Sequence, residues 1–382
     1  MDPGVPTALL GGMTPSAFMR RHWHKRPLLV RQALPGVQPP VTLARLRELA
    51  ARDGVESRLV SHDGTRWHLR RGPLAPRAWP PRSRPGWTVL VQGLDLHDDA
   101  AHALLSRFRF LPQARLDDLM LSYATDGGGV GPHLDSYDVF LLQVHGRRRW
   151  RIGRPVDEAF VEGLPLKILK RFEPEQEWVL EPGDMLYLPP QWAHDGQAVG
   201  DCMTASIGFR APTEGELAAE MLARLADGEP AAGARPRRYR DPTQGATAQP
   251  GEVPLPLARF AARAVVRALS TPGALATALG ETLTEPKPTV WFDEGAVWRG
   301  GGVRLDRRSR MMYDDRHVFL NGESFRAAGR DARAMRRLAD EGRLGAAQVR
   351  GVSPAAREVL AQWVADGWLR EIQDDDDGTP GT

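Results

Sequence analysis

The sequence predicts a chain of the α+β class with several domains, and three observations lead to this prediction. Residues 118–210 form short apolar segments separated by Gly and Pro turns, a pattern typical of a barrel or double sheet. Residues 213–288 instead carry apolar residues at helical spacing. With 382 residues, the chain is also too long for one simple core, so two or three domains are expected.

Short helices and strands are predicted ahead of the barrel, and we place them with it in one domain over residues 1–212. A helix begins at Thr14-Pro15, because Pro is favoured at the first helical position. Asp63-Gly64 is typical of the turn of a β-hairpin. Further helices are expected at 43–53 and 97–108, and strands at 28–30, 57–61, 67–69 and 87–92.

A helical region with an internal linker is predicted over residues 213–288. Thr213 and Glu216 have the spacing of a capping box, which starts a helix. A second helical stretch, 255–283, is interrupted near 271–273, and residues 229–251 have the composition of a linker. The first helix carries an apolar stripe that suits either packing against the barrel or a subunit interface: Leu217, Met221, Leu222 and Leu225.

The last part of the chain predicts a small separate domain over residues 289–373. Short strands flank turns such as Asn321-Gly322, and helices are expected near 331–341 and 354–367. Strands and short helices in a domain of this size resemble a winged helix. The acidic run that follows, 374–382, is expected to form a solvated, disordered tail.

Composition favours a cytoplasmic protein without a membrane span. No stretch reaches about 18 consecutive apolar residues, and the N-terminus lacks a basic-then-apolar leader. The single cysteine, Cys202, fits a reducing compartment. Only four of the 51 basic residues are Lys, so Arg dominates, yet a net charge of +3 does not demand a nucleic-acid partner. We therefore expect no direct contact with nucleic acid.

The most informative motif is His133-Leu134-Asp135, followed by His194 after a gap of 58 residues. Side chains at positions i and i+2 of a strand share one face. A distant His then completes a set of two imidazoles and one carboxylate. Three such ligands on one face of a metal leave three positions open, the usual arrangement in non-haem Fe(II) oxygenases. Because the first motif is short, structural histidines remain the alternative.

The surroundings of these residues favour the metal interpretation. Residues 127–131 contain four glycines and are expected to form a flexible lead-in. Residues 137–142 then predict a strand, so that Tyr137 shares the face of His133 and Asp135. His194 follows a predicted strand at 186–188 and a proline turn.

Strand alternation assigns further residues to an inner pocket. Asp118, Met120 and Ser122 share one face of a strand whose other face is apolar, so the three are expected to point inward. Ser206 faces the same pocket mouth by the same rule.

Arg148 is the one arginine of the triplet 147–149 that alternation points inside, because it shares parity with Trp150 and Ile152. A buried Arg requires an anion. Either a dicarboxylate co-substrate, held by a fork of two hydrogen bonds, or a protein carboxylate would supply it.

Six short motifs together resemble a known family. They are Arg20-x-x-Trp23-x-Lys25-Arg26-Pro27-Leu28, Asp117-Asp118-Leu119-Met120, the run from Gly127 to Asp135, Arg147-Arg148-Arg149-Trp150, Glu181-Pro182-Gly183-Asp184 and Ser206-x-Gly208-Phe209-Arg210-Ala211-Pro212. In these residues the chain is similar to the bacterial ribosomal oxygenases of the JmjC type, strongly over about 15–212 and more loosely beyond. The nearest resemblance is to members that hydroxylate an arginine of large-subunit ribosomal protein sixteen.

This resemblance implies a fold and an activity. The fold is a JmjC double-stranded β-helix, a cupin-like jelly roll, followed by a helical dimerisation region and a C-terminal winged helix. The activity requires Fe(II), 2-oxoglutarate and O2, and hydroxylates the β-carbon of an arginine in a protein of the large ribosomal subunit. A homodimer is implied as well.

The resemblance also implies roles for residues at matching positions. His133, Asp135 and His194 resemble the iron ligands, and Ser122 and Arg148 the 2-oxoglutarate contacts. The target arginine would lie among Asp118, Met120, Tyr137 and Ser206, with Asp118 pairing the guanidinium. Residues 191–193 read Gln-Trp-Ala, where relatives tend to carry Gly-Phe-Pro, and this departure bears on the pocket rim.

Three other functions remain open. A histidine hydroxylase of another ribosomal protein would share the same core, although an unpaired Asp118 beside Tyr137 would suit a guanidinium better than a neutral imidazole. Asp118 could instead cap a turn or pair with a nearby Arg. A non-oxidative metal-binding cupin would not need Arg148. A DNA-binding regulator is disfavoured, because helix 354–367 offers Arg357 beside Glu358 and Asp366, a poor phosphate surface.

Overall fold

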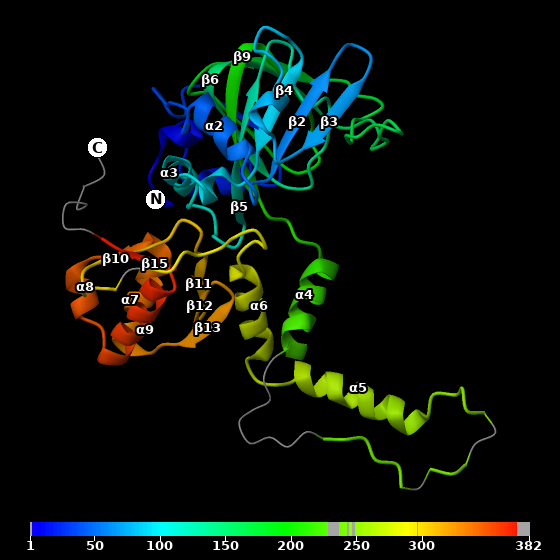
Figure 1. Cartoon of the computed structure of the whole chain (residues 1–382), viewed down its shortest axis with the longest axis vertical. Coiled ribbons are helices and arrows are strands. Elements are labelled where there is room, and N and C mark those ends of the chain that lie inside the picture. Colours follow the sequence, from blue (N-terminus) through cyan, green and yellow to red (C-terminus); the bar gives the residue numbers. More distant parts are fainter. Residues whose placement is uncertain (1, 228–236, 243, 247–248, 296, 373–382) are drawn as a thin grey trace. The chain divides into compact units, whose positions relative to one another are not determined.

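The computed structural model describes residues 2–227, 237–242, 244–246, 249–295 and 297–372 (Figure 1). Two units are distinguished along the chain. The first comprises Met1–Ala211 with Pro288–Trp291, and the second Pro212–Lys287 with Phe292–Thr382. The predicted acidic tail, 374–382, and part of the predicted linker lie outside the described residues.

A bent sheet forms the body of the first unit (Figure 1). Two long strands, β6 (Val139–Gly153) and β9 (Ala193–Phe209), pair antiparallel along most of their length. One half of this pair is joined by β5 (Leu116–Ala124) and β8 (Met185–Leu188), and the other half by β7 (Gln176–Leu180). The result is the cupin-like jelly roll expected of the sequence.

Shorter strands and helices complete the first unit. The predicted hairpin is confirmed as β2 (Ser57–His62) and β3 (Trp67–Arg71), which continue the sheet beyond β4 (Trp87–Val91). Strand β1 (Leu28–Val30) pairs with β8 at the opposite edge. The helices are α1 (Pro15–Arg21), α2 (Leu43–Ala50) and α3 (Asp99–Ser106), with 3-10 turns at Ala8–Leu10, Pro76–Ala78 and Leu94–Leu96. As predicted, α1 starts with Pro15, and the Thr14 side chain caps it.

The outward face of the sheet packs against these helices, and this leaves the inward face for a pocket. Alternate residues of β5, Leu119 and Leu121, are fully buried in one cluster with Phe18 of α1 and Leu46 of α2. Burial of each such side chain stabilises the fold by roughly 1.5–3 kcal/mol. The residues that alternate with them, Met120 and Ser122, therefore point to the other side, as alternation predicted.

A buried carboxylate holds the chain just before β6 begins. Asp138 is fully buried and accepts a hydrogen bond of 2.5 Å from the Tyr187 hydroxyl. Its second oxygen lies 3.3 Å from His24 Nε2 and 3.6 Å from Arg115 Nη2. Burial raises the pKa of Asp138, and these partners oppose that rise. The contacts anchor the backbone next to Tyr137, which faces the pocket.

Three helices open the second unit. The predicted capping box is confirmed at the start of α4 (Glu214–Asp227), where Thr213 and Glu216 hydrogen-bond each other reciprocally. The predicted helical stretch is confirmed as α5 (Leu255–Leu269) and α6 (Ala274–Thr284), separated by Gly273 in the left-handed region. None of the described helices has the length and apolarity needed to cross a membrane.

The rest of the second unit is a small domain with its own core. Two three-stranded sheets are described, β14 (Arg343–Leu344) with β10 (Val303–Leu305) and β15 (Leu369–Glu371), and β11 (Met311–Tyr313) with β12 (His317–Leu320) and β13 (Glu323–Arg326). The helices are α7 (Gly329–Glu341), α8 (Ala346–Arg350), which the sequence did not predict, and α9 (Pro354–Ala365). Leu338 and Leu360 are fully buried between them.

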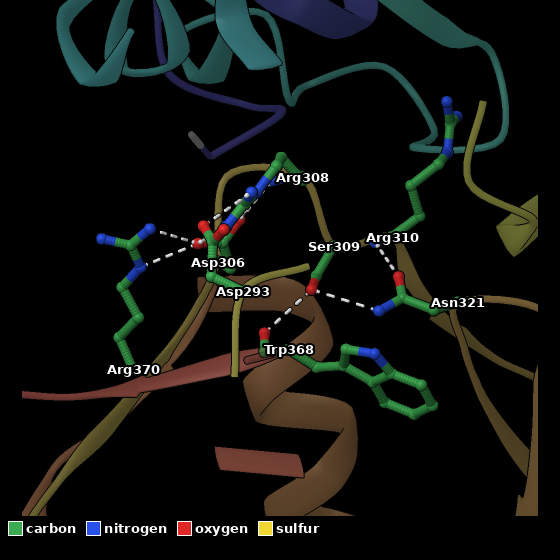
Figure 2. A network of polar contacts seen from close by, with 8 residues as sticks. All are labelled: Asp293, Asp306, Arg308, Ser309, Arg310, Asn321, Trp368 and Arg370. Carbon is green, nitrogen blue, oxygen red and sulfur yellow. Dashed lines mark hydrogen bonds and ion pairs between the residues drawn. The ribbon is translucent and has the colours of Figure 1, made fainter. Parts of the chain in front are cut away.

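A polar network ties the strands of this domain together (Figure 2). Asp306 is almost fully buried and accepts hydrogen bonds from Arg308 at 2.8 Å and Arg370 at 2.7 Å. Burial alone would raise the pKa of Asp306, but the hydrogen bonds from Arg308 hold it below its usual range. Ser309 links the Trp368 carbonyl to Asn321. A buried carboxylate that is paired with two guanidinium groups in this way is typical of a structural role.

Candidate metal centre and substrate pocket

The three residues of the predicted metal motif lie together in the first unit. One ligand atom each from His133, Asp135 and His194 lies within 4.8 Å of the others. His194 belongs to the start of β9, and His133 pairs with it through two backbone hydrogen bonds of 3.0 Å. Asp135 lies in the loop that follows, because β6 begins only at Val139. The predicted strand therefore starts later than expected, yet both side chains still face the same point.

Backbone carbonyls orient both imidazoles. Nδ1 of His133 lies 2.9 Å from the Gly131 carbonyl, and Nδ1 of His194 lies 2.9 Å from the Trp192 carbonyl. A carbonyl oxygen only accepts, so each Nδ1 carries the proton. The lone pair of each ring is then on Nε2, the atom left to bind a metal.

Burial keeps His194 neutral. Desolvation, followed by the nearby charge of His133, lowers the pKa of His194 to about 4. A neutral imidazole is the form that ligates a metal. Two imidazole nitrogens and one carboxylate oxygen are a donor set that suits Fe(II).

Residues 191–193, where the sequence differs from that of relatives, support the predicted metal ligands through backbone hydrogen bonds. Gln191 has a φ of 62°, and its N–H donates to the Asp135 carbonyl at 2.9 Å. The next residue, Trp192, supplies the carbonyl that orients His194, while its ring lies 5.2 Å from the Arg154 guanidinium. The unusual side chains at 191 and 192 are thus compatible with an intact ligand set.

The glycine run before His133 is tightly packed, so the expectation of a flexible lead-in is wrong. The N–H of Gly127 donates to the Ala198 carbonyl at 3.0 Å, and the Gly128 carbonyl accepts from Ala198 at 2.9 Å. A Cβ on Gly129 would lie only 2.5 Å from the Gly196 carbonyl oxygen. Glycine is needed here because two backbone segments approach each other closely.

Arg148 points inside, and no ion pair to a carboxylate is seen for it within the described residues. It is 5% exposed, whereas Arg147 and Arg149 are exposed, as alternation predicted. Among the described residues, its Nε and Nη2 find no hydrogen-bond partner. Its guanidinium lies 5.7 Å from the centre of the Trp150 ring. A buried guanidinium in this state is stabilised strongly by an anionic ligand.

The metal motif and Arg148 line one cavity of about 500 Å3. The cavity is large enough for a small co-substrate together with a protein side chain. Ser122, almost fully buried, donates to the Thr204 carbonyl at 3.3 Å. Every residue that the sequence assigned to the site lines this cavity: His133, Asp135, His194, Ser122, Arg148, Asp118, Met120, Tyr137 and Ser206.

Asp118 does not present the unpaired charge that we expected. Nε2 of Gln92 lies 2.9 Å from both oxygens of its carboxylate. Since a carboxylate only accepts, the amide nitrogen must face Asp118, and the amide oxygen faces Arg58 Nη2 at 3.3 Å. Gln92 and Arg58 were not among the predicted site residues. Strand alternation could have assigned Gln92 to the pocket. It is the last residue of the predicted strand 87–92 and lies on the same face as Leu90.

Tyr137 forms an aromatic wall of the same cavity. It is 39% exposed, and desolvation, followed by the charges of Asp135 and Asp118, raises the pKa of its phenol. The hydroxyl therefore stays protonated at neutral pH. The sulfur of Met120, which also lines the cavity, lies 3.8 Å from Arg58 Nη2.

Family models match both units of the chain. The model for the JmjC domain matches residues 103–217, and that for a ROXA-like winged helix matches residues 267–370. A curated relative from Escherichia coli (strain K12), ribosomal protein uL16 3-hydroxylase, is 40% identical over 203 residues. That match spans 52% of this chain and 53% of the relative, so about half of its length.

Solved structures match almost the whole chain. An X-ray structure of E. coli YcfD is 31% identical, with 94% of this chain and 98% of that chain covered and a TM-score of 0.79. YcfD, a ribosomal oxygenase, in complex with cobalt and 2-oxoglutarate is 30% identical over the same shares, with a TM-score of 0.77. Because both sequence and fold agree over nearly the full length of these relatives, the chain belongs to the ribosomal oxygenases with a JmjC domain.

Proposed function

We propose that the chain is an Fe(II)- and 2-oxoglutarate-dependent hydroxylase of a ribosomal protein. The observation that carries this proposal is the buried, unneutralised guanidinium of Arg148 in the same cavity as the His-Asp-His cluster. A cupin that only binds a metal has no use for such a group, whereas a dicarboxylate co-substrate needs one. The relative that was solved with cobalt and 2-oxoglutarate supports the same choice.

The residues divide into a metal site and a co-substrate site. His133, Asp135 and His194 hold the iron, and Arg148 with Ser122 binds the far carboxylate of 2-oxoglutarate. When bound, the iron supplies the chemistry by which O2 and 2-oxoglutarate convert a C–H bond to C–OH, with succinate and CO2 as the other products. The protein itself fixes the ligands and aims one C–H bond at the metal.

The target that the pocket favours is an arginine, and the uL16 3-hydroxylase suggests the β-carbon of an arginine in uL16, the large-subunit protein sixteen. Asp118 lies in the cavity as an anion fixed by Gln92, and Tyr137 offers a ring face. A guanidinium gains charge-assisted hydrogen bonds from the first and stacking from the second. Met120 and Ser206 complete the pocket. A histidine target is the second candidate, but a neutral imidazole gains less from Asp118.

We also propose a homodimer formed through the helices of the second unit. Of the expected apolar stripe of α4, Leu222 is 48% exposed, and Leu217, Met221 and Leu225 are half-buried. On α5, Leu255 and Val266 are 59% and 61% exposed. A second copy of the chain would bury these faces. A ribosomal protein as substrate agrees with a cytoplasmic location.

The function is tested by mass spectrometry. The purified chain, incubated with ribosomal proteins, Fe(II), 2-oxoglutarate and O2, is expected to add one oxygen, about 16 Da, to uL16. Asp135→Ala should abolish the addition, because it removes a ligand and a charge from the metal site. An unmodified set of ribosomal proteins, or undiminished activity of Asp135→Ala, would contradict the proposal.

Replacing Arg148 should raise the 2-oxoglutarate requirement. Loss of one partner of a buried, charged hydrogen-bonded pair costs about 2–5 kcal/mol, at least about 30-fold in affinity. Titration of 2-oxoglutarate against Arg148→Ala should show this loss, and the matched variants Arg147→Ala and Arg149→Ala should behave as the wild type. Sensitivity of either neighbour instead would overturn the assignment of Arg148.

Asp118 should set the preference for arginine over histidine. Two versions of a uL16 peptide, with Arg or His at the target position, are to be assayed with the wild type and with Asp118→Asn. The wild type should favour Arg, and the variant should lose most of that preference, about 1–3 kcal/mol. Equal rates of both peptides with the wild type would remove the arginine assignment and leave the oxygenase intact.

The dimer predicts a mass in solution of twice the 42.2 kDa of one chain. Light scattering at micromolar concentration should give this value, and Val266→Asp should shift it toward one chain, because a charge would be buried in the interface. Arg52→Asp, which changes charge at an exposed position of the first unit, is the control. A monomeric wild type would refute the proposal.

A further inference from the structure

Gly208 occupies a position of the sheet that points into the substrate pocket. It lies on β9 directly opposite Asp118 of β5, and on its other side directly opposite Val139 of β6. Residues opposite each other in antiparallel strands place their side chains on the same face. Since Asp118 and Val139 both line the cavity, a side chain at position 208 would enter it too.

The backbone does not require glycine at this position. Gly208 is absent from the described residues with positive φ, so an L side chain could adopt its conformation. A Cβ built there would lie 3.8 Å from Asp118 Oδ1 and 3.9 Å from Tyr137 Cε2, both ordinary van der Waals distances. A glycine inside a strand weakens the strand unless something needs the space. The two nearest atoms belong to the two residues that would hold the target side chain.

One wall of this space is held rigidly. The Asp118 carboxylate is fixed by Gln92, whose amide oxygen is in turn held by Arg58. The carboxylate therefore cannot turn aside easily to make room for a bulkier group at position 208.

We propose that Gly208 determines which side-chain head the pocket accepts. Its missing side chain leaves a slot between Asp118 and Tyr137 that admits a planar guanidinium, which bonds to the carboxylate while it stacks on the ring. This inference rests on the proposed function and names a residue that shapes its specificity. A methyl group at position 208 would take volume that the guanidinium needs. One extra carbon in a pocket changes discrimination by roughly 10–200-fold.

The test adds volume to the slot in steps. The full chain as wild type, Gly208→Ala and Gly208→Val is to be assayed with Fe(II), 2-oxoglutarate and the Arg or Lys version of a uL16 peptide. The KM for the Arg peptide should rise by about tenfold or more in Gly208→Ala and further in Gly208→Val. The Lys peptide should lose less, because an ammonium head is more compact.

Two further measurements distinguish a specific loss of substrate binding from general damage to the protein. In Gly208→Ala, the KM for 2-oxoglutarate in peptide-free turnover should match the wild type, since Arg148 and the metal ligands are untouched. The thermal midpoint should not fall below that of the wild type, because alanine replaces a glycine inside a strand without a clash. Gly251→Ala is the matched control, because a Cβ there meets no atom of the described residues within 4 Å.

The outcomes distinguish this inference from the proposed function. If the wild type hydroxylates the Arg peptide and Gly208→Ala does so with the same KM, Gly208 has no role in specificity and the proposed function stands. If Gly208→Ala loses affinity for Arg and Lys peptides equally, the position affects entry and does not select the head group. If the wild type modifies neither peptide, the proposed function and this inference fall together.

Discussion

The backbone pair between His133 and His194 is the contact on which the site depends. Two hydrogen bonds of 3.0 Å join residues that are distant in sequence, one before β6 and one at the start of β9. This pair places both imidazoles at one point, where neighbouring carbonyls turn each Nε2 toward the same space. The tightly packed glycine run and Gln191 hold the two segments in register. The metal site is thus set by backbone geometry, with side-chain packing in support.

The cavity around this pair has opposite charges in two different subsites. Arg148 supplies a buried cation whose Nε and Nη2 have no hydrogen-bond partner among the described residues, and the Asp118 carboxylate is held in place by a neutral amide. A cavity of this kind sorts two ligands by charge, because a dicarboxylate is attracted to one subsite and a cationic side chain to the other. The three predicted metal ligands line the same cavity as Arg148 and Asp118.

Much of the first unit follows from two-residue alternation, because one face of its sheet packs on helices and the other lines the cavity. This constraint made the inward direction of Met120, Ser122 and Arg148 predictable. The same rule placed Asp135 correctly even though the local backbone is a loop. The rule could direct Gln92 inward, but it could not place Gln92 and Arg58 beside Asp118, because the neighbour on another strand depends on register.

The sequence by itself determined the α+β class, the starts of α1 and α4, the break between α5 and α6, and the residues able to ligate a metal. These features depend on local capping, turn chemistry and periodicity, all of which act over a few residues. Only the tertiary structure decided that the glycine run is packed, that Asp118 is held by Gln92, and that Gly208 leaves a slot beside Tyr137. Each of these depends on the distance between atoms of separate strands, which no local pattern encodes.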